Sequence, residues 1–278
     1  MRSMEIGVMN SLGKEPGRNI FAEVAEFGLK VCQLVNWNPD LWTEEMARRV
    51  VRDSKASGVR VCALWTGQPG PAQWNMVEGH TTLGLVPPEY REMRVAALKK
   101  GADFAKWIGV PAIITHCGFV PEEPTHPFHD GTVAAIREVA AYCKQKGLGF
   151  WFESGQETPV TLLRTIEDVG TGNLGVNLDP ANLILYGKGN PIDALDVIGK
   201  YVRNLHAKDG LYPTTGRELG REVPVGKGKV RFPEFLKKLY KLGFRGELII
   251  EREISGPQQA KDIRKTVNDL KRWRGRLK

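Results

Sequence analysis

Four short apolar runs in this sequence each end on a residue that can bind a metal ion. The four end residues are Glu153, Asp179, His206 and Glu251. This oxygen-rich set with one imidazole favours Mn²⁺ or Mg²⁺, with Co²⁺ also suitable, whereas a structural zinc site would use more sulfur or histidine. Three unpaired carboxylates in one pocket would repel one another, and a divalent cation removes that repulsion. We therefore predict a site for one divalent metal ion, with Mn²⁺ as the first choice.

The runs that carry these residues are short and apolar, as buried strands are. They span Leu148–Glu153, Leu174–Asp179, Tyr201–His206 and Glu247–Glu251. Four earlier runs of the same kind span Glu5–Met9, Lys30–Asn36, Val59–Trp65 and Pro111–His116. Because side chains alternate across a strand, Glu253 would point to the same side as Glu251. We prefer Glu251 as the metal ligand, since it directly follows the apolar run.

Segments with helical periodicity separate these strands. They span 20–27, 41–57, 89–108, 133–146, 159–169, 191–199, 232–242 and 258–273. Strands that alternate with helices pair in parallel through right-handed crossovers, and eight such units close into a barrel. The sequence predicts an α/β fold, a (β/α)8 TIM barrel, as a single domain over residues 1–278. Its catalytic face would lie at the carboxyl ends of the strands, where the four end residues meet.

Size and composition agree with one barrel. The length of 278 residues is close to the roughly 250 of a typical TIM barrel, and 41% hydrophobic residues allow a substantial core. No apolar stretch approaches the ~20 residues that a membrane helix needs, the start does not resemble a signal peptide, and the four cysteines form no CxxC pair. We expect a cytoplasmic protein without disulfides.

The formal net charge of +8 would suit an anionic partner. Much of the excess lies in 261–278, where apolar residues recur at helical spacing, and this pattern indicates a solvated helix face. We expect a small-molecule sugar as partner, no nucleic acid and no membrane, with a homo-oligomer left open. The alternative, a non-catalytic or nucleic-acid-binding barrel, predicts DNA affinity that falls steeply with salt.

Five motifs give the chain a resemblance to a known family. They are FES at Glu153, NLDPAN at Asp179, LHAKD at His206, VPVGKGKVRFPEFL at Val223–Leu236 and IIERE at Glu251. Across nearly its whole length the chain resembles the xylose-isomerase-like TIM barrels, in the branch of ketose 3-epimerases, hydroxypyruvate isomerase and inosose enzymes. The resemblance implies that these four residues bind one divalent metal and that Glu153 and Glu251 also act as acid and base.

Such a site would act on a sugar that carries a carbonyl. A ketose chelated through O2 and O3 has a polarised carbonyl, so two glutamates on opposite faces could remove and return a proton through an enediolate. The first hypothesis is a metal-dependent isomerase, most simply a ketose 3-epimerase. A lyase or dehydratase of a keto-sugar, keto-inositol or 3-keto-glycoside shares the first step and stays open. An apurinic-endonuclease-like repair enzyme is less favoured: that branch of the family has a three-metal centre with further histidines around the sixth and seventh strands, where this chain has Pro180-Ala181-Asn182 and Asp209-Gly210.

Further side chains at the strand ends and in the long loops are candidates for binding substrate. They are His116, Trp37, Trp65, Gln156, Asn182, Lys208 and Arg217. The tryptophans could stack on a sugar or pack in the core, with equal weight, and His116 ends the fourth strand. Lys208 and Arg217 could hold hydroxyls or a phosphate. Several ketose epimerases carry a histidine where Asn182 stands, so the sugar is left open.

Overall fold

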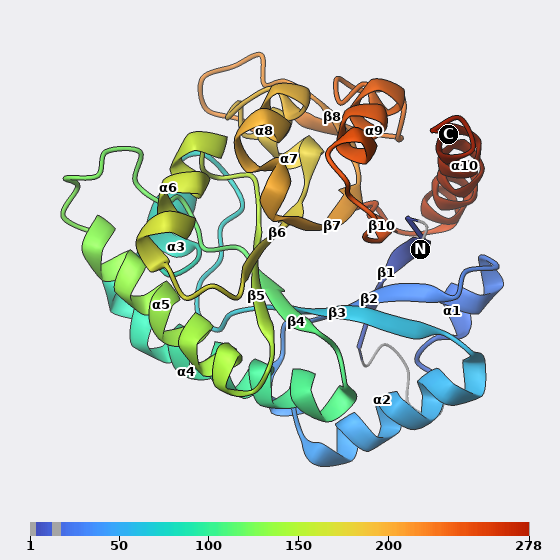
Figure 1. The fold of residues 1–278 in the computed structure, drawn as a ribbon, viewed down its shortest axis with the longest axis horizontal. Coiled ribbons are helices and arrows are strands. Elements are labelled where there is room, and N and C mark those ends of the chain that lie inside the picture. The colour runs from blue at the N-terminus through green and yellow to red at the C-terminus, as the bar shows by residue number, and fades with distance from the viewer. Residues whose placement is uncertain (1–3, 13–17, 278) are drawn as a thin grey trace.

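Eight parallel strands close into a barrel in the computed structural model, which describes residues 4–12 and 18–277 (Figure 1). The strands are β1 (Ile6–Ser11), β2 (Val31–Asn36), β3 (Arg60–Thr66), β4 (Ala112–Thr115), β5 (Gly149–Glu153), β6 (Leu174–Leu178), β7 (Val202–Ala207) and β10 (Leu248–Ile250). Their order around the barrel is β1-β10-β7-β6-β5-β4-β3-β2. The predicted (β/α)8 fold is confirmed, and the four strands that carry the metal-binding candidates are direct neighbours.

Helices cover the outside of the barrel. They are α1 (Ala22–Glu26), α2 (Glu44–Ser57), α4 (Pro88–Ile108), α5 (His129–Gln145), α6 (Pro159–Val169), α8 (Pro191–Ile198), α9 (Phe232–Lys241) and α10 (Pro257–Arg274). The bounds of α2 have local causes: the Thr43 hydroxyl accepts a hydrogen bond from the Met46 amide, and Gly58 ends the helix with a φ of 65°. α10 contains most of the basic tail and buries Ile263 and Leu270, while Lys278 lies outside the described residues.

Further short elements lie within the segments predicted as loops or at their edges. They are α3 (Gly79–Thr82), α7 (Pro180–Leu185), the 3₁₀ turns η1 (Pro39–Leu41) and η2 (Gly199–Tyr201), and the strands β8 (Asp209–Leu211) and β9 (Arg221–Val223). The strands β8 and β9 form an antiparallel pair after β7. The predicted alternation of eight strands with eight helices therefore misses these short elements. Elements of three to six residues are too short to show a periodic pattern in the sequence.

The segment that follows this hairpin wraps around one buried carboxylate. Asp209 accepts hydrogen bonds from the backbone amides of Gly210, Gly226, Gly228 and Val230, at 2.9–3.1 Å. A Cβ on Gly228 would lie 2.1 Å from Asp209 Oδ1, so this position has no room for a side chain. The Gly-Lys-Gly-Lys run thus forms a turn around Asp209.

The long segment between β3 and α4 is held by one buried arginine. Arg94 is 1% exposed and donates to the carbonyls of Pro69, Pro71, Thr82 and Gly84 at 2.7–3.1 Å. These carbonyls come from both ends of the segment, and the five N–H donors of a guanidinium suit such a cluster of acceptors. The segment, which covers one side of the barrel mouth, is therefore fixed to α4.

We expect Arg94→Met to lower the free energy of unfolding by about 2–5 kcal/mol, because one buried and three part-buried carbonyls lose their donor. Urea unfolding measures the loss, and limited proteolysis should cleave between residues 67 and 87. Arg48→Met, at an exposed arginine paired with Glu44, is the matched control and should change little. Equal stability of the two variants would contradict this role of Arg94.

Among the described residues, no helix combines the length and the apolar character of a membrane span.

The four cysteines, Cys32, Cys62, Cys117 and Cys143, are all buried free thiols. Burial raises the pKa of the Cys62 thiol to about 12, so it is inert at neutral pH.

Candidate metal centre

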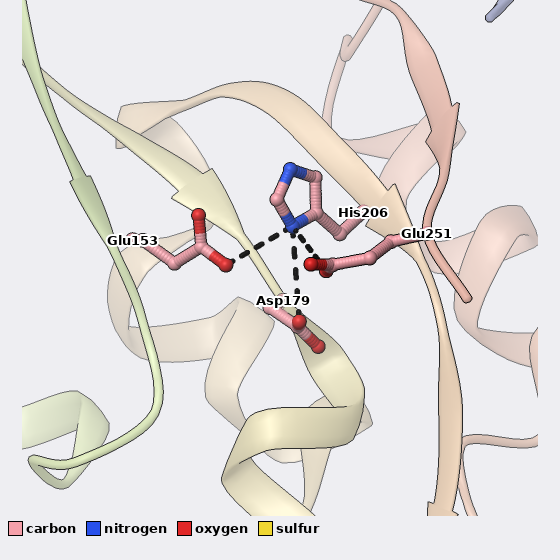
Figure 2. Close-up of side chains that lie close together, drawn as sticks. All are labelled: Glu153, Asp179, His206 and Glu251. Carbon is pink, nitrogen blue, oxygen red and sulfur yellow. Dashed lines mark ion pairs between the residues drawn. The ribbon is translucent and has the colours of Figure 1, made fainter. Parts of the chain in front are cut away.

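The four residues at the strand ends meet at one point of the barrel mouth (Figure 2). Glu153 is the last residue of β5, Asp179 follows β6, His206 lies near the end of β7 and Glu251 follows β10. One ligand atom from each lies within 4.8 Å of all the others, so the group could hold a metal ion. Glu251 belongs to this group of possible metal ligands, whereas Glu253 does not.

The donor atoms of the group face one another around His206 Nδ1. This nitrogen lies 2.9 Å from Glu251 Oε2, 3.1 Å from Glu153 Oε1 and 3.7 Å from Asp179 Oδ2. His206 Nδ1, Asp179 Oδ2 and Glu251 Oε2 are buried, and none of the three makes a hydrogen bond to a described residue. Buried polar atoms without partners are costly, and a divalent cation among them would satisfy all three. The donor set therefore fits a cation.

A chain of side-chain hydrogen bonds fixes the orientation of the His206 ring. Nε2 lies 2.7 Å from Gln33 Oε1, the Gln33 amide donates to Asn177 Oδ1 at 3.1 Å, and Asn177 Nδ2 donates to Glu153 Oε2 at 3.1 Å. Asn177 Nδ2 also lies 3.0 Å from Nε2. An amide oxygen only accepts, so the Gln33 contact suits a proton on Nε2; with a metal ion bound, the ring would be neutral and the lone pair of Nδ1 would face the carboxylates. Gln33 and Asn177 thus present His206 as a ligand.

The charges of the group call for a positive charge at its centre. Burial lowers the pKa of His206, but the carboxylates of Glu153 and Glu251 outweigh burial and raise it well above the ordinary value. Burial raises the pKa of Glu153, but His206 and His116 outweigh burial and lower it. Burial also raises the pKa of Glu251, but Lys208 and His206 outweigh burial and lower it. Both carboxylates are ionised at neutral pH. A proton on His206 compensates them here, and a divalent cation would replace that proton.

We expect Gln33→Leu to weaken Mn²⁺ binding by about 10–100-fold, because the His206 Nε2 proton loses its acceptor. Titration calorimetry with Mn²⁺ measures the change. The matched control is Gln68→Leu, whose amide contacts Thr115 and the His116 carbonyl instead of the cluster. Unchanged Mn²⁺ affinity in Gln33→Leu would show that the ring is oriented by packing alone.

A cavity of about 400 Å³ opens above the cluster. It is lined by Met9, Val35, Trp37, Trp65, Trp74, His116, Glu153, Asn182, Leu185, Tyr186, Lys208, Leu219, Glu251 and Glu253. Its size and its mostly apolar wall with a few convergent polar groups are typical of small-molecule sites.

Five of the seven predicted substrate-binding residues line this cavity: Trp37, Trp65, His116, Asn182 and Lys208. The structure does not bring the other two to its wall. Gln156 is fully buried beyond the turn at Gly155, and Arg217 is exposed in the connection between β8 and β9. Gln156 is only three residues from Glu153 in the sequence, but the chain turns sharply after β5, so Gln156 does not reach the cavity wall.

Trp65 and His116 contact the cluster itself. The Trp65 indole donates to Glu153 Oε2 at 2.6 Å, and His116 Nε2 lies 3.6 Å from Glu153 Oε1. Trp65 and Asn177 together hold one oxygen of Glu153, which leaves Oε1 for the centre. Burial lowers the pKa of His116, so its imidazole is neutral near pH 7.

Several residues of the site were not predicted from the sequence. They include Gln33 behind the cluster and Met9, Val35, Trp74, Leu185, Tyr186 and Leu219 in the cavity wall. Gln33 carries a signal, since it is a polar residue inside an apolar strand, in the phase that faces inward. Trp74 carries none, because it lies in an aperiodic segment.

The chain matches the family model of the xylose isomerase-like TIM barrels over residues 21–273. It therefore belongs to this family. It is similar to a xylose isomerase domain protein from Planctomyces limnophilus, with 36% identity, a TM-score of 0.93 and 99% of both chains covered. An uncharacterized protein from Methanocaldococcus jannaschii is 24% identical over 194 residues, 65% of this chain. That match spans 64% of the relative, less than two thirds of its length.

More distant solved structures share the fold alone. A D-tagatose 3-epimerase-like protein has 19% identity and a TM-score of 0.75 over 99% of this chain and 98% of its own. Structures with 14–17% identity include a magnesium complex from Mycobacterium smegmatis, D-psicose, D-allulose and L-ribulose 3-epimerases, a probable 3-DHS dehydratase from Bacillus anthracis and a 3-keto-D-glucoside 4-epimerase from E. coli.

Proposed function

We propose that this protein is a divalent-metal-dependent isomerase or epimerase of a keto-sugar, with Mn²⁺ as the ion and 3-epimerisation of a ketose as the simplest reaction. One observation carries the proposal: Glu153 and Glu251 belong to the cation-binding group and also line the cavity above it. Two carboxylates beside one cation are the groups that removal and return of a carbon-bound proton require. The epimerases among the more distant relatives support this choice.

Asp179 and His206 would hold the ion together with the two glutamates; their buried ligand atoms face one another and make no hydrogen bond to a described residue. The ion would polarise the sugar carbonyl and make the adjacent C–H bond more acidic. Either glutamate would then remove the proton from that carbon and leave an enediolate. The other glutamate would have to enter the step protonated; it would give its proton to the opposite face, which inverts the carbon and leaves the proton that was removed on the first glutamate.

The surroundings of Glu153 suit it to this role. Trp65 and Asn177 donate to Oε2, so the carboxylate is held in one orientation with Oε1 toward the centre. A fixed base avoids the cost of reorganisation during proton transfer. Glu153 is 3% exposed, and the aromatic wall limits water around it.

A second candidate is elimination by a lyase or dehydratase, which begins with the same proton removal. Lys208 favours it, since an ammonium that lines the cavity 3.5 Å from Glu251 could hydrogen-bond to a leaving oxygen and stabilise its negative charge. In either reaction the partner is a small sugar. We propose no nucleic-acid or membrane partner, because the residues of the site line a cavity of small-molecule size and most of the basic residues near the carboxyl end lie on α10.

The test is incubation of the Mn²⁺-loaded protein with ketoses, inososes and 3-keto-glycosides in deuterated water. Deuterium at the carbon beside the carbonyl, without loss of a substituent, supports the epimerase. Release of water or of an alcohol supports the lyase. Mn²⁺-loaded protein that exchanges no substrate proton in the whole set would overturn both.

A further inference from the structure

Two tryptophans at the mouth of the cavity are exposed, although large aromatic side chains are usually covered. Trp37 is 46% exposed and Trp74 is 39% exposed. Their rings are in edge contact, with centroids 5.8 Å apart, and both line the cavity. We call this pair the rim shelf. An exposed apolar surface next to a site is typical of a surface that binds ligand.

The rim shelf is held in place despite its exposure. A Cβ on Gly67 would lie 2.6 Å from ring atoms of Trp37, so the indole rests directly on the backbone of Gly67. The centroids of Trp37 and Trp65 are 4.7 Å apart, and those of Trp74 and His116 are 5.0 Å apart. A ligand would therefore meet a surface that needs no ordering on binding.

Trp65 lies on the inner side of the shelf and is already engaged. It is 5% exposed, and its indole nitrogen donates to Glu153. The position over the carboxylates is thus walled by Trp65, whereas Trp37 and Trp74 extend the same aromatic wall outward. A ligand that extends beyond the sugar ring over the metal ligands would meet the rim shelf.

The wall across the barrel from the rim shelf is also apolar. Trp37 and Trp74 follow β2 and β3, whereas Leu185, Tyr186 and Leu219 follow β6 and β7 on the other side of the barrel. A flat ring suits a slot between two apolar walls. The cavity measures about 400 Å³, within the roughly 300–1,000 Å³ of pockets that enclose drug-sized ligands. A single sugar ring does not fill this volume.

We infer that the keto-sugar bound by this protein is part of a glycoside, and that a second ring, glycosyl or aryl, stacks on the rim shelf. This inference rests on the proposed function for the reacting ring. It places the second ring outside the metal ligands, where its C–H or aromatic face contacts the two indoles.

Non-reactive glycosides test the inference independently of turnover. Methyl β-glucoside, phenyl β-glucoside and cellobiose would be titrated into the Mn²⁺-loaded protein by calorimetry. We expect the two-ring compounds to bind about ten-fold more tightly than methyl β-glucoside. The tighter of the two identifies the second ring as aryl or glycosyl.

Variants locate the effect. Trp37→Ala and Trp74→Ala should each reduce the ten-fold advantage of the two-ring compounds over methyl β-glucoside to about three-fold or less, while Trp74→Phe retains most of it. Trp107→Ala is the matched control, because Trp107 is 44% exposed but lies on α4, away from the cavity. Thermal melts exclude misfolding.

The inference is overturned if no glycoside binds, if the two-ring compounds gain no affinity, or if the gain survives both alanine variants. Proton exchange on free ketoses without such a gain would leave the proposed function standing and remove the second ring. If binding of two-ring compounds depends on the rim shelf but no keto-sugar exchanges a proton, the second-ring site stands and the proposed function falls.

Discussion

Glu153→Gln is expected to abolish turnover and to leave Mn²⁺ bound weakly. The amide cannot accept the substrate proton, and loss of a general base costs about 10²–10⁴ in rate. Trp65 and Asn177 both donate to one oxygen of this side chain, so the amide oxygen takes that place and the NH₂ group faces the centre. An NH₂ group is no ligand, which explains the expected loss of Mn²⁺ affinity.

The measurement is single-turnover rate at saturating Mn²⁺, with Mn²⁺ affinity determined in parallel. Glu157→Gln is the matched control: Glu157 is buried outside the cluster, and burial raises its pKa to about 8. Its carboxyl is protonated at pH 7, so glutamine changes its charge little. A wild-type rate in Glu153→Gln at saturating Mn²⁺ would remove the acid and base assignment.

The main features of the fold could be predicted from local pattern. Apolar runs bounded by glycine and proline marked all eight barrel strands to within two residues at either end, and the predicted helix 159–169 coincides with α6. Each predicted ligand stands where an apolar run stops. Because parallel strands of a barrel share one carboxyl end, this local signal also implies their convergence.

The network that orients the ligands could not be predicted in this way. Gln33 and Asn177 are 144 residues apart and lie on β2 and β6, on opposite sides of the barrel. Their contact depends on barrel closure and on two inward-facing side chains meeting across its axis. No periodic pattern within either strand reports such a pairing. Trp74 was hidden for a related reason, since Arg94 fixes its segment through backbone carbonyls, which carry no sequence signal.

Lys208 is a cation in the wall of the cavity. Its Nζ lies 2.9 Å from Glu253 Oε2 and 3.5 Å from both Asp179 Oδ2 and Glu251 Oε2, and it donates to Asn182 Oδ1. Burial lowers its pKa, but the carboxylates of Glu251 and Asp179 outweigh burial and raise it well above the ordinary value. It is therefore charged at neutral pH, beside the position where an enediolate would develop negative charge.

Lys208→Met is accordingly expected to lower kcat by about 10²–10³-fold, the usual cost of removing one preorganised group that stabilises an oxyanion. Mn²⁺ affinity should stay equal or rise, because the carboxylates lose a competing positive charge. This opposite response separates a role in stabilising the reacting sugar from a role in holding the cluster together.

Kinetics at saturating Mn²⁺ and calorimetry with Mn²⁺ make the measurement. Lys188→Met is the matched control, since Lys188 pairs with Glu122 at 3.2 Å outside the cavity. If Lys208→Met loses Mn²⁺ and regains its rate when the ion is supplied in excess, the ammonium acts only by organising the carboxylates. If kcat stays low with the ion bound, the positive charge of Lys208 acts on the substrate itself.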